Sequence, residues 1–314
     1  MAVICTVLLN SCGNRDSVKT KEIIIFHAGS LSVPLRILKS NYEKKNPAIK
    51  IFLEPAGSLV CARKITELKK PCDIIASADY FVINEMIIPE YSDWSIRFAT
   101  NEMVIAYHEK SRYSSVINSD NWIEILLKDD VIYARSDPDL DPGGYRTVLA
   151  LMLAEKYYKK EGLTEEMVIK NKDFVRPKEV DLIALIESNA IDYMFQYKSV
   201  AIQHGLSYIE LPDDINLSNP TKEEIYSSVS IDVTGNKPGT KMNVTGGYIN
   251  YSLTILDEAP ERDEAIDFIS YVLSDEGLEI FRKNGQNPII PFSTEQFDRI
   301  PSKLRQYLPD YNVK

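Results

Sequence analysis

Short apolar runs alternate with stretches of helical periodicity in the first third of the chain. Residues 23–26 form a continuous apolar run, which is typical of a strand buried on both faces. Apolar residues then recur at helical spacing from Leu31 to Tyr42, and Asn46-Pro47 ends the pattern. The alternation continues with a strand, a helix and a strand at 49–53, 59–70 and 73–76. This order predicts a parallel sheet covered by helices.

Two longer strand-like stretches, 98–107 and 246–255, bracket a second series of elements. That series comprises predicted helices at 122–128, 145–160 and 180–188 and predicted strands at 131–134, 191–197 and 208–211. Beyond 255 the chain is predicted to be mostly helical, with segments at 264–273 and 277–283. We therefore expect an α/β protein of two lobes, joined by two crossover strands, with a ligand cleft between them. Lobe I would comprise 23–105 and 247–314, and lobe II 106–246.

The composition is that of a folded protein without a nucleic-acid-binding face. The chain has 314 residues but only 16 Pro and 13 Gly, which excludes collagen-like and largely disordered chains. This length exceeds what one core usually organises, which agrees with two lobes. The formal net charge is −10 and no basic cluster stands out, so we expect no nucleic-acid partner. No CxxC or HExxH spacing indicates a zinc site.

The first residues differ from the rest of the chain. Residues 1–12 are predicted to be a signal and lipoprotein leader, because their apolar run is far shorter than the about 20 residues that span a bilayer. The sequence Leu9-Asn10-Ser11-Cys12-Gly13 looks like a lipobox, which makes Cys12 a candidate for lipidation. Residues 13–22 are predicted to form a polar tether. We expect an exported protein on the outer face of the cell membrane, anchored through Cys12; the alternative is a disordered cytosolic N-terminus.

Three predicted helices begin with small residues directly after a predicted strand. Two of these starts are Ala-Gly-Ser sequences ending at Ser30 and Ser58, and the third is Asp141-Pro142-Gly143-Gly144. Glycine allows close approach of the backbone, and free N–H groups at a helix N-terminus favour an anion. Together the three starts predict an anion site that needs no Lys or Arg. The alternative is that both serines are ordinary N-caps.

Four segments, taken in order, resemble the molybdate/tungstate-binding proteins of ABC importers, especially their archaeal branch. The resemblance runs from about Glu22 to Pro291, and its most specific segments are 26–31, 136–146, 176–180 and 192–201. It implies a type II periplasmic-binding-protein-like fold. It also implies that the chain is no enzyme, that it carries no cofactor, and that it captures tungstate or molybdate as a monomer. The oxyanion would then pass to a membrane-embedded ABC permease with its ATPase.

The resemblance also assigns roles to residues of this chain. Ser30 and Ser58 would bind oxyanion oxygens through hydroxyl and backbone N–H groups, and the turn Asp141-Pro142-Gly143 would form the binding turn of the middle domain. Glu179 and Tyr197 resemble the remaining pair of contacts. In the archaeal branch two carboxylates ligate the metal in distorted octahedral coordination, and here these would be Asp141 and Glu179. Gly143-Gly144 differs from the Cys-Gly pair associated with this turn.

Several alternatives stay open at this point. Asp141 can be a turn or capping carboxylate, and Glu179 a first-turn acid of a helix. The same architecture could serve a sulfate or ferric-ion receptor, and Ser30 with His27 could belong to a serine hydrolase, although Gly-x-Ser-x-Gly is absent. The choice between tungstate and molybdate also stays open, as do a Cys61–Cys72 disulfide and glycosylation at Asn243.

Overall fold

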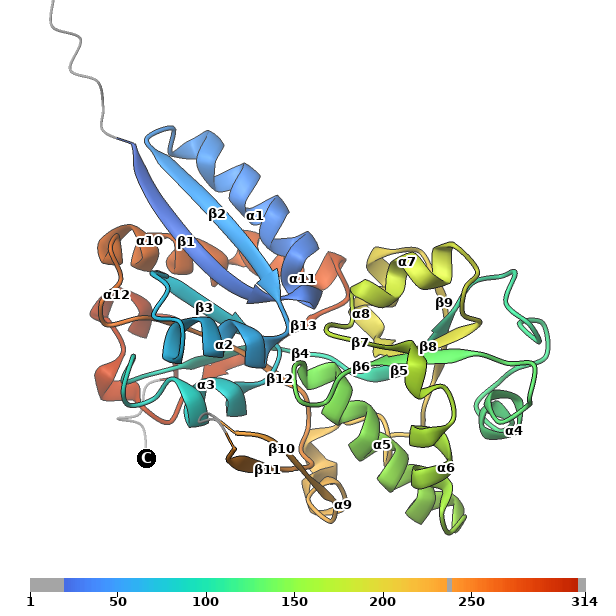
Figure 1. Cartoon of the computed structure of the whole chain (residues 1–314). Coiled ribbons are helices and arrows are strands. Elements are labelled where there is room, and N and C mark those ends of the chain that lie inside the picture. Colours follow the sequence, from blue (N-terminus) through green and yellow to red (C-terminus); the bar gives the residue numbers. More distant parts are fainter. Residues whose placement is uncertain (1–19, 236–238, 310–314) are drawn as a thin grey trace, which may run out of the picture.

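The computed structural model describes residues 20–235 and 239–309. Two lobes lie side by side, each built on a central sheet with helices packed on its faces (Figure 1). The sheet of lobe I has the strand order β13-β4-β12-β3-β1-β2, and that of lobe II has the order β7-β6-β8-β5-β9. The predicted α/β class and two-lobed architecture are confirmed.

The first three strands of lobe I pair in parallel, as the alternation predicted. They are β1 (Lys21–Ala28), β2 (Ile49–Ala56) and β3 (Ile74–Ser77). The connecting helices are α1 (Ser32–Lys45), α2 (Ser58–Thr66) and the unpredicted α3 (Tyr80–Met86), capped by Asp79. Because parallel strands end at one edge of their sheet, the turns after β1, β2 and β3 meet there.

The predicted strand at 98–107 is wrong as a single element. It is two strands, β4 (Ile96–Thr100) and β5 (Met103–Tyr107), which belong to the sheets of different lobes. The chain crosses between them at Asn101 and Glu102. The buried Asn101 amide holds this crossing, because it donates to Ser199 Oγ at 2.7 Å and to Tyr251 OH at 2.9 Å. The second long stretch is also shorter than predicted, since β12 spans Asn250–Ile255.

Lobe II contains a mixed sheet, covered by one long helix and several short ones. Its strands are β6 (Tyr133–Ser136), β7 (Val175–Arg176), β8 (Tyr193–Tyr197) and β9 (Ser207–Glu210), beside β5. Its helices are α4 (Trp122–Leu126), α5 (Pro142–Tyr158), α6 (Leu163–Ile169), α7 (Asp181–Glu187), α8 (Lys198–Gln203) and α9 (Glu223–Tyr226). Pro142 starts α5, where a missing N–H costs nothing.

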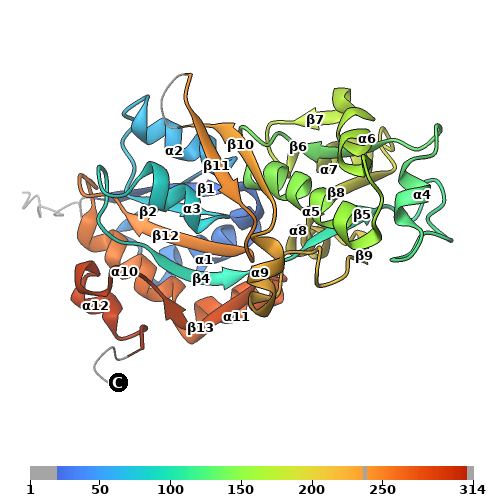
Figure 2. The ribbon, with the colours of Figure 1, turned by 90° about the horizontal axis from the view of Figure 1, so that it is seen from below.

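Two features were not predicted. The antiparallel hairpin of β10 (Ser230–Thr234) and β11 (Lys241–Thr245) lies beside α5 and extends toward α2 of lobe I (Figure 2). The strand β13 (Asn287–Ser293) forms the edge of the lobe I sheet, although this part of the chain was predicted to be mostly helical. The remaining helices are α10 (Arg262–Val272), α11 (Asp275–Lys283) and α12 (Ser302–Arg305).

The N-terminal predictions fall largely outside the described residues. Cys12, the predicted leader 1–12 and most of the tether 13–22 lie there, and the end of the predicted tether, Lys21 and Glu22, belongs to β1. In residues 20–235 and 239–309, no helix is both long and apolar enough to cross a membrane. Cys61 and Cys72 are buried free thiols, so they form no disulfide in this structure.

His27 is buried at the end of β1, and its burial predicts acid-sensitive stability. Desolvation lowers the pKa of His27 to about 4, while its ring donates from Nδ1 to the Ala28 carbonyl. An unfolded His has a pKa near 6.5. The stability contributed by keeping His27 neutral is therefore complete above about pH 6.5 and lost as the pH falls toward 4, by up to about 3 kcal/mol. Urea unfolding at pH 7 and pH 4.5 should show a larger fall for the wild type than for His27→Gln; equal falls would contradict this.

Candidate functional site

The three predicted helix starts converge where the two lobes meet. The Ser30 backbone N–H of lobe I donates to Glu179 Oε1 of lobe II at 2.7 Å. The Glu179 backbone N–H in turn donates to Asp141 Oδ2 at 3.2 Å. A Cβ on Gly57, the residue before Ser58, would lie 3.1 Å from the Asp141 Cβ. The structure thus brings Ser30, Ser58, Asp141 and Glu179 together in a buried region.

Neither serine is a helix cap. Ser30 lies in the short 3-10 turn Gly29–Leu31 between β1 and α1, and Ser58 is the first residue of α2. The N-cap positions of α1 and α2 are Leu31 and Gly57, and neither helix start has a side-chain capping bond. The capping alternative for the serines is therefore not supported.

The two carboxylates also lack the local roles considered as alternatives. Asp141 occupies the N-cap position of α5, but its side chain makes no capping bond and binds the Glu179 N–H instead. Glu179 precedes α7, and its Oε1 accepts a hydrogen bond from the other lobe rather than from its own helix. Both side chains are thus directed into the interface between the lobes.

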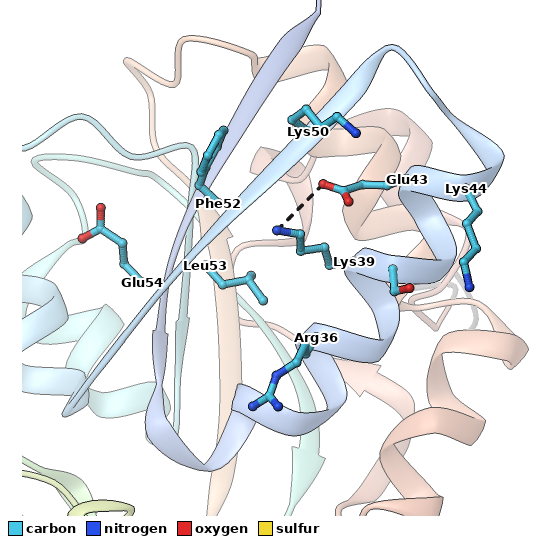
Figure 3. A pocket seen from close by; sticks show the side chains of 9 residues that line it. Arg36, Lys39, Glu43, Lys44, Lys50, Phe52, Leu53 and Glu54 are labelled. Carbon is cyan, nitrogen blue, oxygen red and sulfur yellow. Dashed lines mark ion pairs between the residues drawn. The ribbon is translucent and has the colours of Figure 1, made fainter.

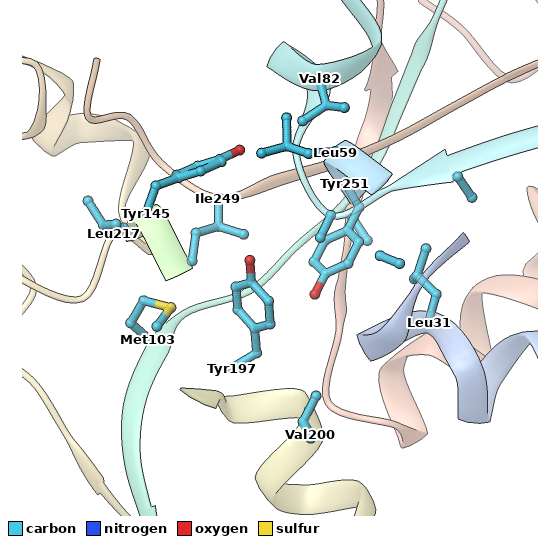
Figure 4. Close-up of a cluster of buried hydrophobic side chains, with 14 of the residues drawn as sticks. Leu31, Leu59, Val82, Met103, Tyr145, Tyr197, Val200, Leu217, Ile249 and Tyr251 are labelled. Carbon is cyan, nitrogen blue, oxygen red and sulfur yellow. The ribbon is translucent and has the colours of Figure 1, made fainter. Parts of the chain in front are cut away.

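Three buried hydroxyl groups are arranged as hydrogen-bond donors toward this region. Ser30 Oγ accepts from Tyr251 OH at 2.9 Å, Ser58 Oγ from the Ala78 N–H at 3.0 Å, and Tyr197 OH from Arg146 Nη1 at 3.1 Å. Each oxygen therefore already has a donor, while none of the three hydroxyl hydrogens has an acceptor in the described part of the chain. Figure 4 shows Tyr197 and Tyr251 close to each other at the junction of the lobes, and their ring centroids are 6.1 Å apart. Such hydroxyls suit a ligand that only accepts hydrogen bonds.

Both carboxylates are almost completely buried. Asp141 is 0% exposed and Glu179 is 1% exposed. Burial raises the pKa of Asp141 well above its ordinary value, and the nearby Glu179 charge raises it further. Asp141 Oδ1 and Glu179 Oε2 are buried without a hydrogen-bond partner among the described residues. Buried polar atoms are normally satisfied, so these two oxygens are the candidate contacts for a bound ligand.

The Ser30 N–H has a protein partner in this structure, since it donates to the Glu179 carboxylate. Its predicted contact with an oxyanion oxygen stays a prediction. The hydroxyl of Ser30 remains directed as a donor. Among residues 20–235 and 239–309, no group of three or more His, Cys, Asp or Glu is placed to hold a metal ion.

The glycines of the Asp141 turn are explained by close packing. A Cβ on Gly144 would lie 2.4 Å from the Asp137 carbonyl carbon, which excludes any larger residue without a backbone shift. A Cβ on Gly143 would lie 3.0 Å from both Asp141 Oδ2 and Ser136 Oγ. The space beside the Asp141 carboxylate is thus tight where the resemblance would place a cysteine.

The residues that support these hydroxyls were missed from sequence. Tyr251, Ala78 and Arg146 each donate to one of them, and Asp79 pairs with Arg146. One signal could have indicated Asp79: it follows β3 at the sheet edge where Ser30 follows β1 and Ser58 follows β2. Tyr251 lies 221 residues from Ser30, so its contact could not be inferred from spacing.

A separate surface groove lies on lobe I, away from these residues. It has a volume of about 820 Å³ between α1 and β2 (Figure 3). Its lining residues are Arg36, Lys39, Ser40, Glu43, Lys44, Lys50, Phe52, Leu53 and Glu54. None of them is a predicted site residue. The buried convergence of the lobes therefore remains the candidate site.

Comparison with known proteins agrees with this architecture. The model of the family described as bacterial extracellular solute-binding protein matches residues 23–287. An uncharacterized solute-binding protein of Petrotoga mobilis is 47% identical, over 92% of this chain and 90% of its own. The molybdate/tungstate-binding protein WtpA of Pyrococcus abyssi is 42% identical, over 97% and 95% respectively. The periplasmic molybdate-binding protein of Azotobacter vinelandii has the same fold, with a TM-score of 0.61 at 14% identity, over 86% of this chain and 99% of that one. With a family match over most of its length, the chain belongs to the extracellular solute-binding proteins.

Proposed function

We propose that this protein captures tungstate or molybdate between its lobes and delivers it to a membrane-embedded ABC permease with its ATPase. The observation that carries the proposal is a buried site that contains both kinds of group. Three hydroxyl groups there are free to donate hydrogen bonds, and two carboxylate oxygens lack a partner among the described residues. The name of the Pyrococcus abyssi relative supports the same ligand class. The protein acts on the outer face of the cell membrane as a monomer without a cofactor, and it is anchored there through Cys12.

Each part of the site has a distinct task under this proposal. The hydroxyls of Ser30, Ser58 and Tyr197 bind oxyanion oxygens. The backbone at Pro142 and Gly143 forms the turn that places Asp141 at the interface between the lobes. Asp141 Oδ1 and Glu179 Oε2 ligate the central metal and expand its coordination from four oxygens to six. At 4 Å, two like unit charges repel by about 4 kcal/mol at an effective dielectric of 20. Direct ligation must outweigh this repulsion, and sulfate, whose sulfur does not readily take two more ligands, gains nothing to offset it.

The other candidate functions fit the geometry less well. A ferric site needs several anionic ligands, whereas the Ser30 and Ser58 hydroxyls in this site are neutral hydrogen-bond donors that suit an anion. A serine hydrolase needs a base hydrogen-bonded to Ser30, and no hydrogen bond joins the two side chains here: His27 Nδ1 donates to the Ala28 carbonyl, its Nε2 has no partner among the described residues, and Ser30 Oγ accepts from the Tyr251 hydroxyl. We therefore infer a binding protein rather than an enzyme.

Isothermal titration with tungstate, molybdate, sulfate and ferric citrate tests the proposal. Tungstate and molybdate should bind, sulfate should bind at least about 100-fold more weakly, and ferric citrate should give no binding heat. Ser58→Ala removes one hydrogen bond to a charged ligand and should weaken tungstate binding by about tenfold or more. Sulfate binding as tight as tungstate binding, or no heat with either metal oxyanion, would contradict the assignment.

A further inference from the structure

A buried ion pair joins the two lobes next to the candidate site. Arg146 of α5 lies in lobe II, and its Nη2 is 2.8 Å from Oδ2 of Asp79, which follows β3 in lobe I. The two side chains are 3% and 9% exposed. In the part of the chain that the structure describes, no other ion pair has both members so deeply buried. A buried pair of this kind is costly to break from one side, because it leaves an unpaired charge.

Further hydrogen bonds across the interface surround this pair. Tyr145, beside Arg146 on α5, donates from its hydroxyl to Asp79 Oδ2 at 2.7 Å. Arg146 Nη1 donates to the Ala78 carbonyl at 2.7 Å and to Tyr197 OH at 3.1 Å. Burial by itself disfavours the charged guanidinium, but the Asp79 carboxylate outweighs this and holds the pKa of Arg146 above its ordinary value. The Arg146 guanidinium is therefore held in its charged form, with hydrogen bonds to Ala78 of lobe I and to Tyr197 of lobe II.

The same network reaches a predicted ligand residue of lobe I. The carbonyl of Ala78 accepts from Arg146, and its N–H donates to Ser58 Oγ at 3.0 Å. Residue 78 is thus held by lobe II on one side while it orients the Ser58 hydroxyl on the other. Loss of the contact with Arg146 would therefore act on this segment as well as on the contact between the lobes. Other hydrogen bonds also link the lobes, among them that of Ser30 N–H to Glu179 and that of Arg63 to the Asp139 carbonyl at 2.8 Å.

We propose that Arg146, Asp79 and Tyr145 form an interlobe latch that stabilises the closed arrangement and positions Ser58, and so sets how long a bound oxyanion is retained. Arg146 and Asp79 act as positioning residues, because they act through other residues rather than on the oxyanion itself. Arg146 donates to Tyr197 OH and to the carbonyl of Ala78, whose N–H orients Ser58, and Asp79 holds Arg146. The retention part of this inference rests on the proposed function. The closure part does not, since the latch joins the lobes whatever the ligand is.

Asp79→Asn tests the latch with little change in shape. Asp79 also caps α3 by accepting from the Phe81 N–H at 3.1 Å, and Asn caps helices about as well as Asp. The variant therefore keeps the cap and removes the charge that faces Arg146. Tyr145→Phe removes one hydrogen bond of the latch and serves as a milder second variant. Asp192→Asn is the matched control, because Asp192 pairs with Arg112 at 2.8 Å within lobe II alone.

Two measurements on the full chain separate the parts of the inference. Small-angle scattering without oxyanion should give a larger radius of gyration for Asp79→Asn than for the wild type and Asp192→Asn. Stopped-flow release of tungstate should be roughly tenfold faster or more for Asp79→Asn, with a smaller increase for Tyr145→Phe. Unchanged scattering and unchanged release in a folded variant would overturn the latch. If tungstate does not bind at all, the proposed function fails and the scattering result alone decides on the latch.

Discussion

Glu179→Gln and Asp141→Asn should each weaken tungstate binding by about 100-fold or more, which corresponds to about 2.7 kcal/mol. Both substitutions keep the size of the side chain, and Gln retains an oxygen that can accept from the Ser30 N–H. They remove the charged oxygen that we assign to the metal. If the carboxylates instead only repel the dianion, the same substitutions should raise affinity for every oxyanion, sulfate included. The two assignments thus predict opposite signs, and isothermal titration distinguishes them.

X-ray absorption of the tungstate complex checks the same assignment without a mutation. Six oxygen neighbours around tungsten in the wild type, and fewer in either variant, are the expected result. Four short equivalent oxygens in the wild type would reject ligation by Asp141 and Glu179. The Asp192→Asn variant serves as the control for charge removal, because its carboxylate lies outside the candidate site and pairs with Arg112.

Gly57→Ala should abolish closure of the lobes and weaken tungstate binding by at least about tenfold. A Cβ at this position would lie 2.3 Å from the carbonyl oxygen of Leu140 in the other lobe, and backbone atoms cannot easily yield. Gly57 itself has φ −59° and ψ 143°, a conformation that alanine adopts without strain. The substitution therefore acts on the contact between lobes and leaves lobe I intact.

Scattering and calorimetry together check this expectation. Tungstate should close the fraction of wild-type molecules that the latch leaves open and so reduce the radius of gyration of the wild type, but it should not reduce that of Gly57→Ala. Without ligand the variant should be as stable as the wild type or slightly more so, since Gly→Ala at a compatible site stabilises by about 0.4–1 kcal/mol through the unfolded chain. Compaction of the variant equal to that of the wild type would show that the Leu140 contact does not limit closure.

The sequence was informative where function depends on local pattern. Strand and helix alternation predicted the parallel core of lobe I, and the turns after β1 and β2 pointed to Ser30 and Ser58. The division of 98–107 was not visible, because both halves are apolar and the two polar residues between them do not interrupt a strand pattern. The resemblance supplied Glu179 and Tyr197, whose roles stay predictions.

The interlobe contacts could not be read from the chain at all. Ser30 and Glu179 are 149 residues apart, and Arg146 and Ala78 are 68 apart. Such contacts depend on how two separately folded sheets come to face each other, and no local periodicity encodes that. The hairpin of β10 and β11 was missed for a related reason, since exposed residues alternate along it with only a few buried ones.

The two lobes contribute different chemistry to the candidate site. Ser30 and Ser58 of lobe I offer hydroxyl donors, whereas lobe II brings both carboxylates together with Tyr197. Under the proposed assignment, any tetrahedral oxyanion satisfies lobe I, but only a central atom that accepts more oxygens satisfies lobe II. The protein would then distinguish tungstate from sulfate in two steps, first when an oxyanion binds lobe I and then when lobe II closes over it. Abundant sulfate would occupy lobe I briefly and slow the uptake of tungstate, but it would dissociate before the lobes close.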